Sequence, residues 1–182
     1  MVFNNTFTRA RRRAGMTLME LMVATAIGSI VMTAVASLSF YTARSFAALS
    51  NYVDLDQKSR NALDRMSQKI RQASGVTSFS SGAVALLYTN GSTLSYAYDS
   101  SSRTLTEALG SETNTLLTEC DALVFEAYAR NPVGGTFDQF PATNDTTTIK
   151  LLQVSWTCSR TILGAKVNTE SVQSAKIVIR KQ

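Results

Sequence analysis

The sequence predicts an α+β protein in which one long N-terminal helix precedes an antiparallel sheet. An uncharged apolar run extends from Leu21 to Ala43. After it, apolar residues recur at three- and four-residue steps as far as Ala73, which is the period of an amphipathic helix. From Val76 onward the apolar residues alternate, which is the period of a strand. A helical block followed by a block of strands is typical of the α+β class.

The apolar run from Leu21 to Ala43 is long enough to cross a hydrocarbon core of about 30 Å as a helix. The segment from Met1 to Gly15 is basic and contains no acidic residue. Its arginines are Arg9, Arg11, Arg12 and Arg13. Because basic flanks stay in the cytoplasm, we expect the chain after Ala43 to lie across the membrane.

The helical pattern continues beyond the apolar run. Its apolar positions include Phe46, Leu49, Val53, Leu63, Met66, Ile70 and Ala73. No proline or glycine occurs between Ser29 and Ser74, and Gly75 stands where a helix would end. We therefore predict one continuous helix from Thr17 to Ser74, whose second half packs on a sheet.

The Asn90-Gly91 pair predicts a hairpin between strands at Ala83–Thr89 and Ser92–Asp99. A two-residue turn would place Leu87 opposite Leu94 and Ala85 opposite Tyr96. The other predictions are a turn at Asp99–Ser102, strands at Arg103–Leu109, Asp121–Ala129, Ile149–Thr157 and Ser174–Arg180, and loops at Gly110–Thr115 and Asn131–Thr148.

Composition argues against several function classes. The formal charge is +5, but four of the eighteen basic residues precede Gly15, so fourteen basic and thirteen acidic residues remain, or +1. Nucleic-acid binding would need a basic patch in the folded domain, and we predict no direct binding of nucleic acid. The chain has no histidine, which removes the commonest general base and zinc ligand.

No catalytic or metal-binding pattern stands out, so we predict no enzyme, no catalytic residues, no metal and no cofactor. Solvated surface charges or isolated pairs are the expected role of the carboxylates in the strand region, which are Glu107, Glu112, Glu119, Asp121 and Glu126. Asp138 and Asp145 lie in the long loop without the dense oxygen-ligand spacing of a calcium site.

Glu20 is the one charge at the start of the apolar run. A carboxylate at the bilayer centre costs about 2.5–3.5 kcal/mol, so it usually has a partner and a function. With Arg11–Arg13, Gly15 and Met16, it forms a pattern that resembles the class III signal of type IV prepilins and pseudopilins. The residues that fit the apolar flank of this family are Thr17, Leu18, Met19, Leu21, Met22, Val23 and Ala24. The alternative is an uncleaved anchor with Glu20 at the membrane interface.

The resemblance implies that a prepilin peptidase cuts after Gly15, that Met16 becomes the N-methylated first residue, and that Glu20 guides assembly. It implies three parts, namely a cleaved basic leader (1–15), a transmembrane and filament-core helix (16–43), and a periplasmic pilin-like domain (44–182). The expected location is the bacterial inner membrane, with a single span, and then a pilus or pseudopilus.

Three further stretches resemble the J-type minor pseudopilins of type II secretion and the W-type minor pilins of type IV pili. They are Leu63–Val76, Tyr96–Thr106 and Leu116–Phe125. Arg180 followed by Lys181 meets only part of the Arg-Asn ending that is usual in this family. The absence of a helix-breaking proline also favours a minor subunit that acts in initiation or at the tip.

Two functions stay open. The first is a structural filament subunit whose partners are other pilins or pseudopilins, the prepilin peptidase and the inner membrane. The second is a membrane-anchored periplasmic binding module, such as an adhesin or a DNA-uptake receptor. Glu20 distinguishes them, because filament assembly requires its charge and a simple anchor does not.

Cys120 and Cys158 are the only cysteines, and the expected topology places both on the oxidising side of the membrane. A disulfide that closes about 37 intervening residues would stabilise the fold by roughly 3–4 kcal/mol on the chain-entropy model. The register that aligns the sulfurs would set Phe125 opposite Gln153, whereas a shift by one residue would match the apolar faces better. A β-bulge would reconcile the two requirements, and two buried free thiols are the alternative.

Overall fold

The computed structural model describes residues 15–130, 140–161 and 170–180, and it confirms the α+β class. The helix α1 (Leu18–Gln72) precedes the strands β1 (Ala73–Phe79), β2 (Ala83–Tyr88), β3 (Thr93–Asp99), β4 (Thr104–Leu109), β5 (Glu112–Leu117), β6 (Cys120–Ala129), β7 (Ile149–Ser159) and β8 (Glu170–Val178). The chain divides into a first unit, Met1–Arg44, and a second unit, Ser45–Gln182, and α1 begins in the first and ends in the second.

In the first unit every described side chain is exposed. The helix runs through Gly28 without a break, as predicted. By length and composition, α1 can cross a membrane. A helix that is apolar on all sides is typical of a segment that is buried by lipid or by other helices.

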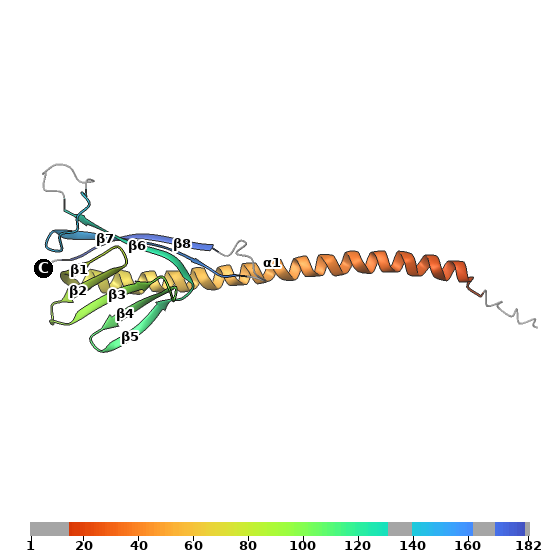
Figure 1. Ribbon diagram of the computed structural model, residues 1–182, viewed down its shortest axis with the longest axis horizontal. Coiled ribbons are helices and arrows are strands. Elements are labelled where there is room, and N and C mark those ends of the chain that lie inside the picture. Colours follow the sequence, from red (N-terminus) through yellow and green to blue (C-terminus); the bar gives the residue numbers. More distant parts are fainter. Residues whose placement is uncertain (1–14, 131–139, 162–169, 181–182) are drawn as a thin grey trace, which may run out of the picture. The chain divides into compact units, whose positions relative to one another are not determined.

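In the second unit α1 buries one face, formed by Leu55, Ser59, Ala62, Met66 and Ile70. Figure 1 shows both sheets beside this part of the helix. The indole Nε1 of Trp156 in β7 donates a hydrogen bond of 3.3 Å to Ser59 Oγ. Leu55, Ala62, Met66 and Ile70 belong to the same hydrophobic core cluster as residues of both sheets, so the amphipathic half of α1 helps to form the core of the second unit.

The end of α1 differs from the prediction. The helix stops at Gln72, and Gly75 lies inside β1, where it pairs with Leu87. Ala73 and Val76 are already buried strand residues, so the chain enters the sheet without the predicted glycine stop. The Tyr88 hydroxyl donates a hydrogen bond of 3.1 Å to the Lys69 carbonyl and so satisfies one of the last carbonyls of the helix.

The larger sheet is antiparallel in the order β1-β2-β3-β4-β5. The predicted hairpin is confirmed in position, but its register is wrong by one residue. Val84 pairs with Tyr96 and Leu86 pairs with Leu94, and all four side chains are buried. The hairpin loop has three residues instead of the predicted two, with Gly91 at φ 79°, and this longer loop causes the shift. Burial favours the observed register, because a slip by one residue would turn every side chain of the strand to the other face of the sheet.

The predicted loop at Gly110–Thr115 is also wrong. Gly110, at φ 60°, begins a tight turn, and β5 pairs with β4 from Glu112 onward. The first four residues of β5 are exposed and polar, and β5 is the edge of its sheet. A polar edge strand has no alternating apolar pattern, so β5 could not be recognised from the sequence.

The smaller sheet has the order β6-β7-β8, and its strands lie close to the predicted positions. Phe125, Val154, Trp156 and Ile177 are buried on its inner side. In the predicted loop at Asn131–Thr148, the described part (140–148) forms an isolated bridge from Ala142 to Tyr128 and a turn after Asp145. Residues 131–139, including Asp138, lie outside the described residues.

Candidate functional site

The predicted cleavage bond lies in a non-helical stretch just before α1. Gly15, Met16 and Thr17 are outside the helix, which begins at Leu18. Met16 is 69% exposed, and no side chain or backbone atom would obstruct a Cβ at Gly15. An exposed, irregular segment is the kind of substrate that proteases prefer. The bond between Gly15 and Met16 is therefore open to a peptidase.

Thr17 and Glu20 form a reciprocal capping box at the start of α1. The Glu20 amide donates to Thr17 Oγ1 at 3.3 Å, and Glu20 Oε2 accepts from the Thr17 amide at 3.0 Å. The Thr17 hydroxyl adds a third bond, at 3.1 Å, to the same Oε2. This arrangement satisfies two amides that the helix leaves unpaired, and it holds a negative charge where the helix dipole favours one.

The sequence analysis placed Thr17 only in the apolar flank and missed this cap. The signal was present, because Thr-x-x-Glu before an apolar run is the pattern of a capping box. The cap fixes the orientation of the one carboxylate at the start of the apolar segment.

The cap uses only one oxygen of Glu20. Both bonds that the carboxylate accepts go to Oε2, and within the described part of the chain no hydrogen bond to Oε1 is recorded. A carboxylate has about four lone-pair sites, so Oε1 can accept further donors while Oε2 remains bonded to Thr17. The exposed Glu20 can thus hold its own helix terminus and a cationic partner at once.

The hydroxyl groups within the apolar run bond to the helix itself. Thr33 Oγ1 donates to the Ser29 carbonyl at 2.8 Å, and Ser37 Oγ donates to the Thr33 carbonyl at 2.8 Å. Thr25, Ser29, Ser39 and Thr42 make equivalent bonds. Because these hydroxyls are satisfied internally, the segment can enter an apolar environment without leaving donors unpaired.

Cys120 and Cys158 lie directly opposite each other at the end of the β6–β7 ladder. A register shift between Cys120 and Ala122 then sets Leu123 opposite Trp156 and Phe125 opposite Val154. This is the β-bulge that reconciles aligned cysteines with matched apolar faces. Directly opposed residues have Cα atoms about 4.5–5.5 Å apart, which is within the range of disulfides.

Both thiols are free and buried in the structure. Cys120 Sγ donates a hydrogen bond of 3.4 Å to the Ala122 carbonyl. Hydrogen bonding with Cys158, together with burial, raises the pKa of the Cys120 thiol. The pair is positioned for a disulfide, but the bond itself stays a prediction.

One of the carboxylates that were expected to be solvated surface charges or isolated pairs is buried in a cluster of several groups. Glu107 in β4 is 1% exposed, and its Oε1 accepts from Arg65 Nη2 at 2.7 Å and from Lys69 Nζ at 2.6 Å. The Tyr96 hydroxyl donates to its Oε2 at 3.1 Å. Burial raises the pKa of Glu107, but the bonds from Lys69 and Arg65 prevail and hold it below its usual value. The cluster fastens α1 to the larger sheet, and the sequence analysis missed it.

A second polar cluster joins α1 to the β5–β6 corner, where Glu119 has a φ of 61°. Arg160 Nη2 lies 2.6 Å from Glu119 Oε2 and 3.0 Å from Asp54 Oδ2 in α1. Hydrogen bonds from Arg160 and burial act on Glu119, and the net effect lowers its pKa. These contacts are structural, and they hold the strand end that carries Cys120.

No group of three or more metal-ligating side chains occurs within residues 15–130, 140–161 and 170–180. The carboxylate of Asp145 serves a local turn, because its Oδ1 accepts hydrogen bonds from the amide and hydroxyl of Thr147 at 3.0 and 2.9 Å. The chemistry of the described residues thus concentrates at the N-terminal segment and the cysteine pair.

Residues 10–36 match a family model described as the prokaryotic N-terminal methylation motif. The match includes Gly15, Met16 and Glu20. No curated protein and no solved structure matches the chain. The motif supports a type IV pilin-like protein and implies a structural subunit rather than an enzyme. Together with the apolar helix, it is consistent with anchoring in the inner membrane and with assembly beside other pilins.

Proposed function

We propose that the chain is a minor pilin or pseudopilin that is processed by a prepilin peptidase and built into a type IV pilus or a type II secretion pseudopilus. The observation that carries this proposal is the exposed carboxylate of Glu20 at the start of an exposed apolar helix, within the methylation motif. The role is in initiation of the filament or at its tip.

Processing removes the basic leader, residues 1–15, and exposes the amine of Met16 for methylation. The non-helical segment around Gly15 suits the peptidase, and the arginines of the leader keep that side in the cytoplasm. Residues 16–43 then serve as the membrane and filament-core helix, and residues 44–182 form the periplasmic domain.

Assembly pairs the Glu20 carboxylate with the methylated N-terminal amine of a neighbouring subunit, which is the Met16 amine where the neighbour is a second copy of this chain. In a medium of low dielectric the pairing relieves two costly charges at once. Since the cap occupies Oε2 alone, the amine can bind Oε1 without unwinding the first turn of α1. Glu20 therefore acts as an assembly residue that is oriented before the partner arrives.

The minor-subunit role is supported by the continuous α1, which passes through Gly28 without a proline break. It is also supported by the resemblance of Leu63–Val76, Tyr96–Thr106 and Leu116–Phe125 to J-type pseudopilins and W-type pilins. A tip subunit has no subunit above it, so its Glu20 would meet the amine of a different subunit type.

Two substitutions separate the charge of Glu20 from its capping function. Glu20→Gln keeps an oxygen that can accept from Thr17 but removes the charge. Thr17→Val removes the capping hydroxyl but keeps the charge. We expect both variants to insert and to be cleaved, while only Glu20→Gln enters filaments poorly. Immunogold labelling and co-purification measure incorporation, and intact mass measures cleavage after Gly15.

Wild-type incorporation of Glu20→Gln would overturn the assembly function and favour a membrane-anchored binding module. An intact mass that retains Arg11–Arg13 in protein from native membranes would overturn the processing step. Equal loss in Glu20→Gln and Thr17→Val would show that the helix terminus, rather than the charge, is what assembly needs.

A further inference from the structure

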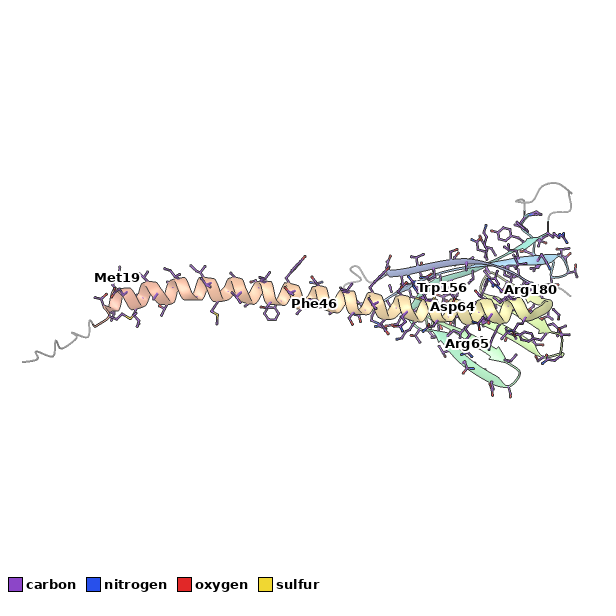
Figure 2. All side chains as sticks on the ribbon, turned by 180° about the vertical axis from the view of Figure 1, so that it is seen from behind. Met19, Phe46, Asp64, Arg65, Trp156 and Arg180 are labelled. Carbon is purple, nitrogen blue, oxygen red and sulfur yellow. The ribbon has the colours of Figure 1, made fainter. Side chains whose placement is uncertain are left out.

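A shallow basic groove lies at the open edge of β8, far from the methylation motif in sequence. Its lining residues are Arg71, Lys176, Val178 and Arg180, and its volume is about 230 Å³. Arg71 comes from the last turn of α1, and the other three come from the end of β8 and the residues after it. Figure 2 shows Arg180 near the last turns of α1. β8 is an edge strand of its sheet, and among the described strands none pairs with its outer edge.

The positive charges of this groove are not balanced by the protein. In the described ranges, no ion pair is recorded for Arg71, Lys176 or Arg180. Six other cations of the second unit have a carboxylate partner, namely Lys58, Arg60, Arg65, Lys69, Arg103 and Arg160, whereas Arg130 and Lys150 resemble the groove cations in having no recorded ion pair in the described ranges.

The surroundings add little negative charge. Lys176 Nζ lies 5.6 Å from the centroid of the Tyr128 ring, which is a cation–π contact that leaves the ammonium charged. Glu126 in β6 and Lys176 in β8 both lie beside Gln153 of β7, which pairs with each of them and separates them. The Glu126 carboxylate accepts a hydrogen bond from the Tyr128 hydroxyl at 3.0 Å. Like charges that gather without counter-charge repel one another, and an anion bound between them would relieve the repulsion.

The residue types favour phosphate over a protein surface. Arginine presents a planar fork of donors that matches phosphate oxygens in pairs. A protein partner would need an apolar anchor at the centre of the contact. Only Val178, 46% exposed, is apolar in this groove. A row of phosphates, rather than an apolar peptide, fits this chemistry.

We propose that the groove formed by Arg71, Lys176 and Arg180 binds the phosphate backbone of nucleic acid without reading its sequence. This activity goes beyond assembly of a filament and does not depend on it. It also revises the expectation of no nucleic-acid binding, which rested on the net charge of +1 outside the leader. A small net charge does not exclude a local basic patch, because most other cations of the second unit are paired with carboxylates.

Fluorescence anisotropy with a labelled 30-base-pair duplex tests the proposal, using the full chain in non-ionic detergent. The variant is Arg71→Gln/Arg180→Gln, and the matched control is Lys58→Gln/Arg60→Gln, which removes two paired cations elsewhere. If each substituted arginine loses one phosphate contact, the slope of log affinity against log salt concentration should become shallower by about 1.8. The affinity of the variant for the duplex should then be about 60-fold lower than that of wild type at 0.1 M salt. The control should bind like wild type. The leader arginines are present in every protein, so they contribute equally.

Three results would overturn the proposal. The first is no binding of the duplex by wild type at 50 mM salt, and the second is an equal loss in both double variants. The third is binding to phosphatidylglycerol vesicles with none to the duplex, which would assign the groove to a lipid surface. The thermal transition followed by Trp156 fluorescence should coincide in all three proteins, so that a folding defect is not mistaken for lost binding.

Discussion

The two halves of α1 share one backbone geometry but are built for different surroundings. From Leu18 to Arg44 all side chains are exposed, and the Ser and Thr hydroxyls bond to carbonyls of the same helix. From Ser45 to Gln72 the helix buries one face, and its polar side chains bond to residues far along the chain, such as Glu107 and Arg160. The first half is self-sufficient, whereas the second half depends on tertiary contacts.

Because of this difference, substitutions in the two units should affect different properties of the protein. In the first unit a substitution changes how the helix meets a partner, because no described side chain there is buried within the chain. In the second unit a substitution changes the free energy of unfolding. Trp156 is the only tryptophan and is 2% exposed in β7, so its fluorescence reports on the second unit alone.

The largest effect should come from oxidation of Cys120 and Cys158, both in the second unit. A thiol oxidant of the compartment would accept two electrons and two protons as the sulfurs join. The closed loop should raise the unfolding free energy by about 3–4 kcal/mol. The measurement is the Trp156 transition with and without reductant, together with thiol labelling of denatured, unreduced protein from native membranes.

The control for this prediction is Cys120→Ala/Cys158→Ala, whose transition should not respond to reductant. Two free thiols per chain in protein from native membranes would contradict the bridge. A monomeric band without free thiols would support it.

The same substitution in the two halves of α1 should differ by about 3 kcal/mol. Met66 is fully buried, so Met66→Ala leaves a cavity and loses transfer energy. Met32 is 72% exposed, and Met32→Ala should leave the Trp156 transition within about 0.5 kcal/mol of wild type. Chemical denaturation in detergent measures both. Equal effects would mean that the two halves do not differ in the way their burial indicates.

Glu107→Gln should destabilise the second unit by about 2 kcal/mol, since it weakens charged hydrogen bonds to Arg65 and Lys69. The pKa of Glu107 is lowered in the folded state from 4.5, so its contribution is present above that value. It is lost as the pH falls through the folded pKa. The difference between wild type and Glu107→Gln should therefore shrink on acidification from pH 6 to pH 3. A constant difference would exclude the charge as its source.

The smallest effect should be local to the first unit. Thr17→Val removes the capping hydroxyl and should destabilise the first turn of α1 by about 1 kcal/mol. Amide hydrogen exchange at Leu18–Leu21 should accelerate while the Trp156 transition stays unchanged. Thr25→Val is the matched control, because the Thr25 hydroxyl bonds to the Met22 carbonyl inside the helix and caps nothing. Unaltered exchange in Thr17→Val would contradict the capping box.

The sequence alone determined the features that depend on neighbours along the chain. The motif from Arg11 to Glu20, the continuous helix, and the turn at Asn90-Gly91 were all predicted, because periodicity, charge order and turn chemistry are local properties. The cap between Thr17 and Glu20 was equally local and could have been predicted.

Only the tertiary structure decided the features that join distant residues. Burial of Val84, Leu86, Leu94 and Tyr96 selected the hairpin register against the turn that the sequence favoured. The bulge after Cys120, the enclosure of Glu107 and the polar edge strand β5 likewise had no local pattern. The basic groove brings together Arg71 from the last turn of α1 and Arg180 from the residues after β8. Each of these depends on which faces pack together, and packing is settled by contacts between segments that no short stretch of sequence contains.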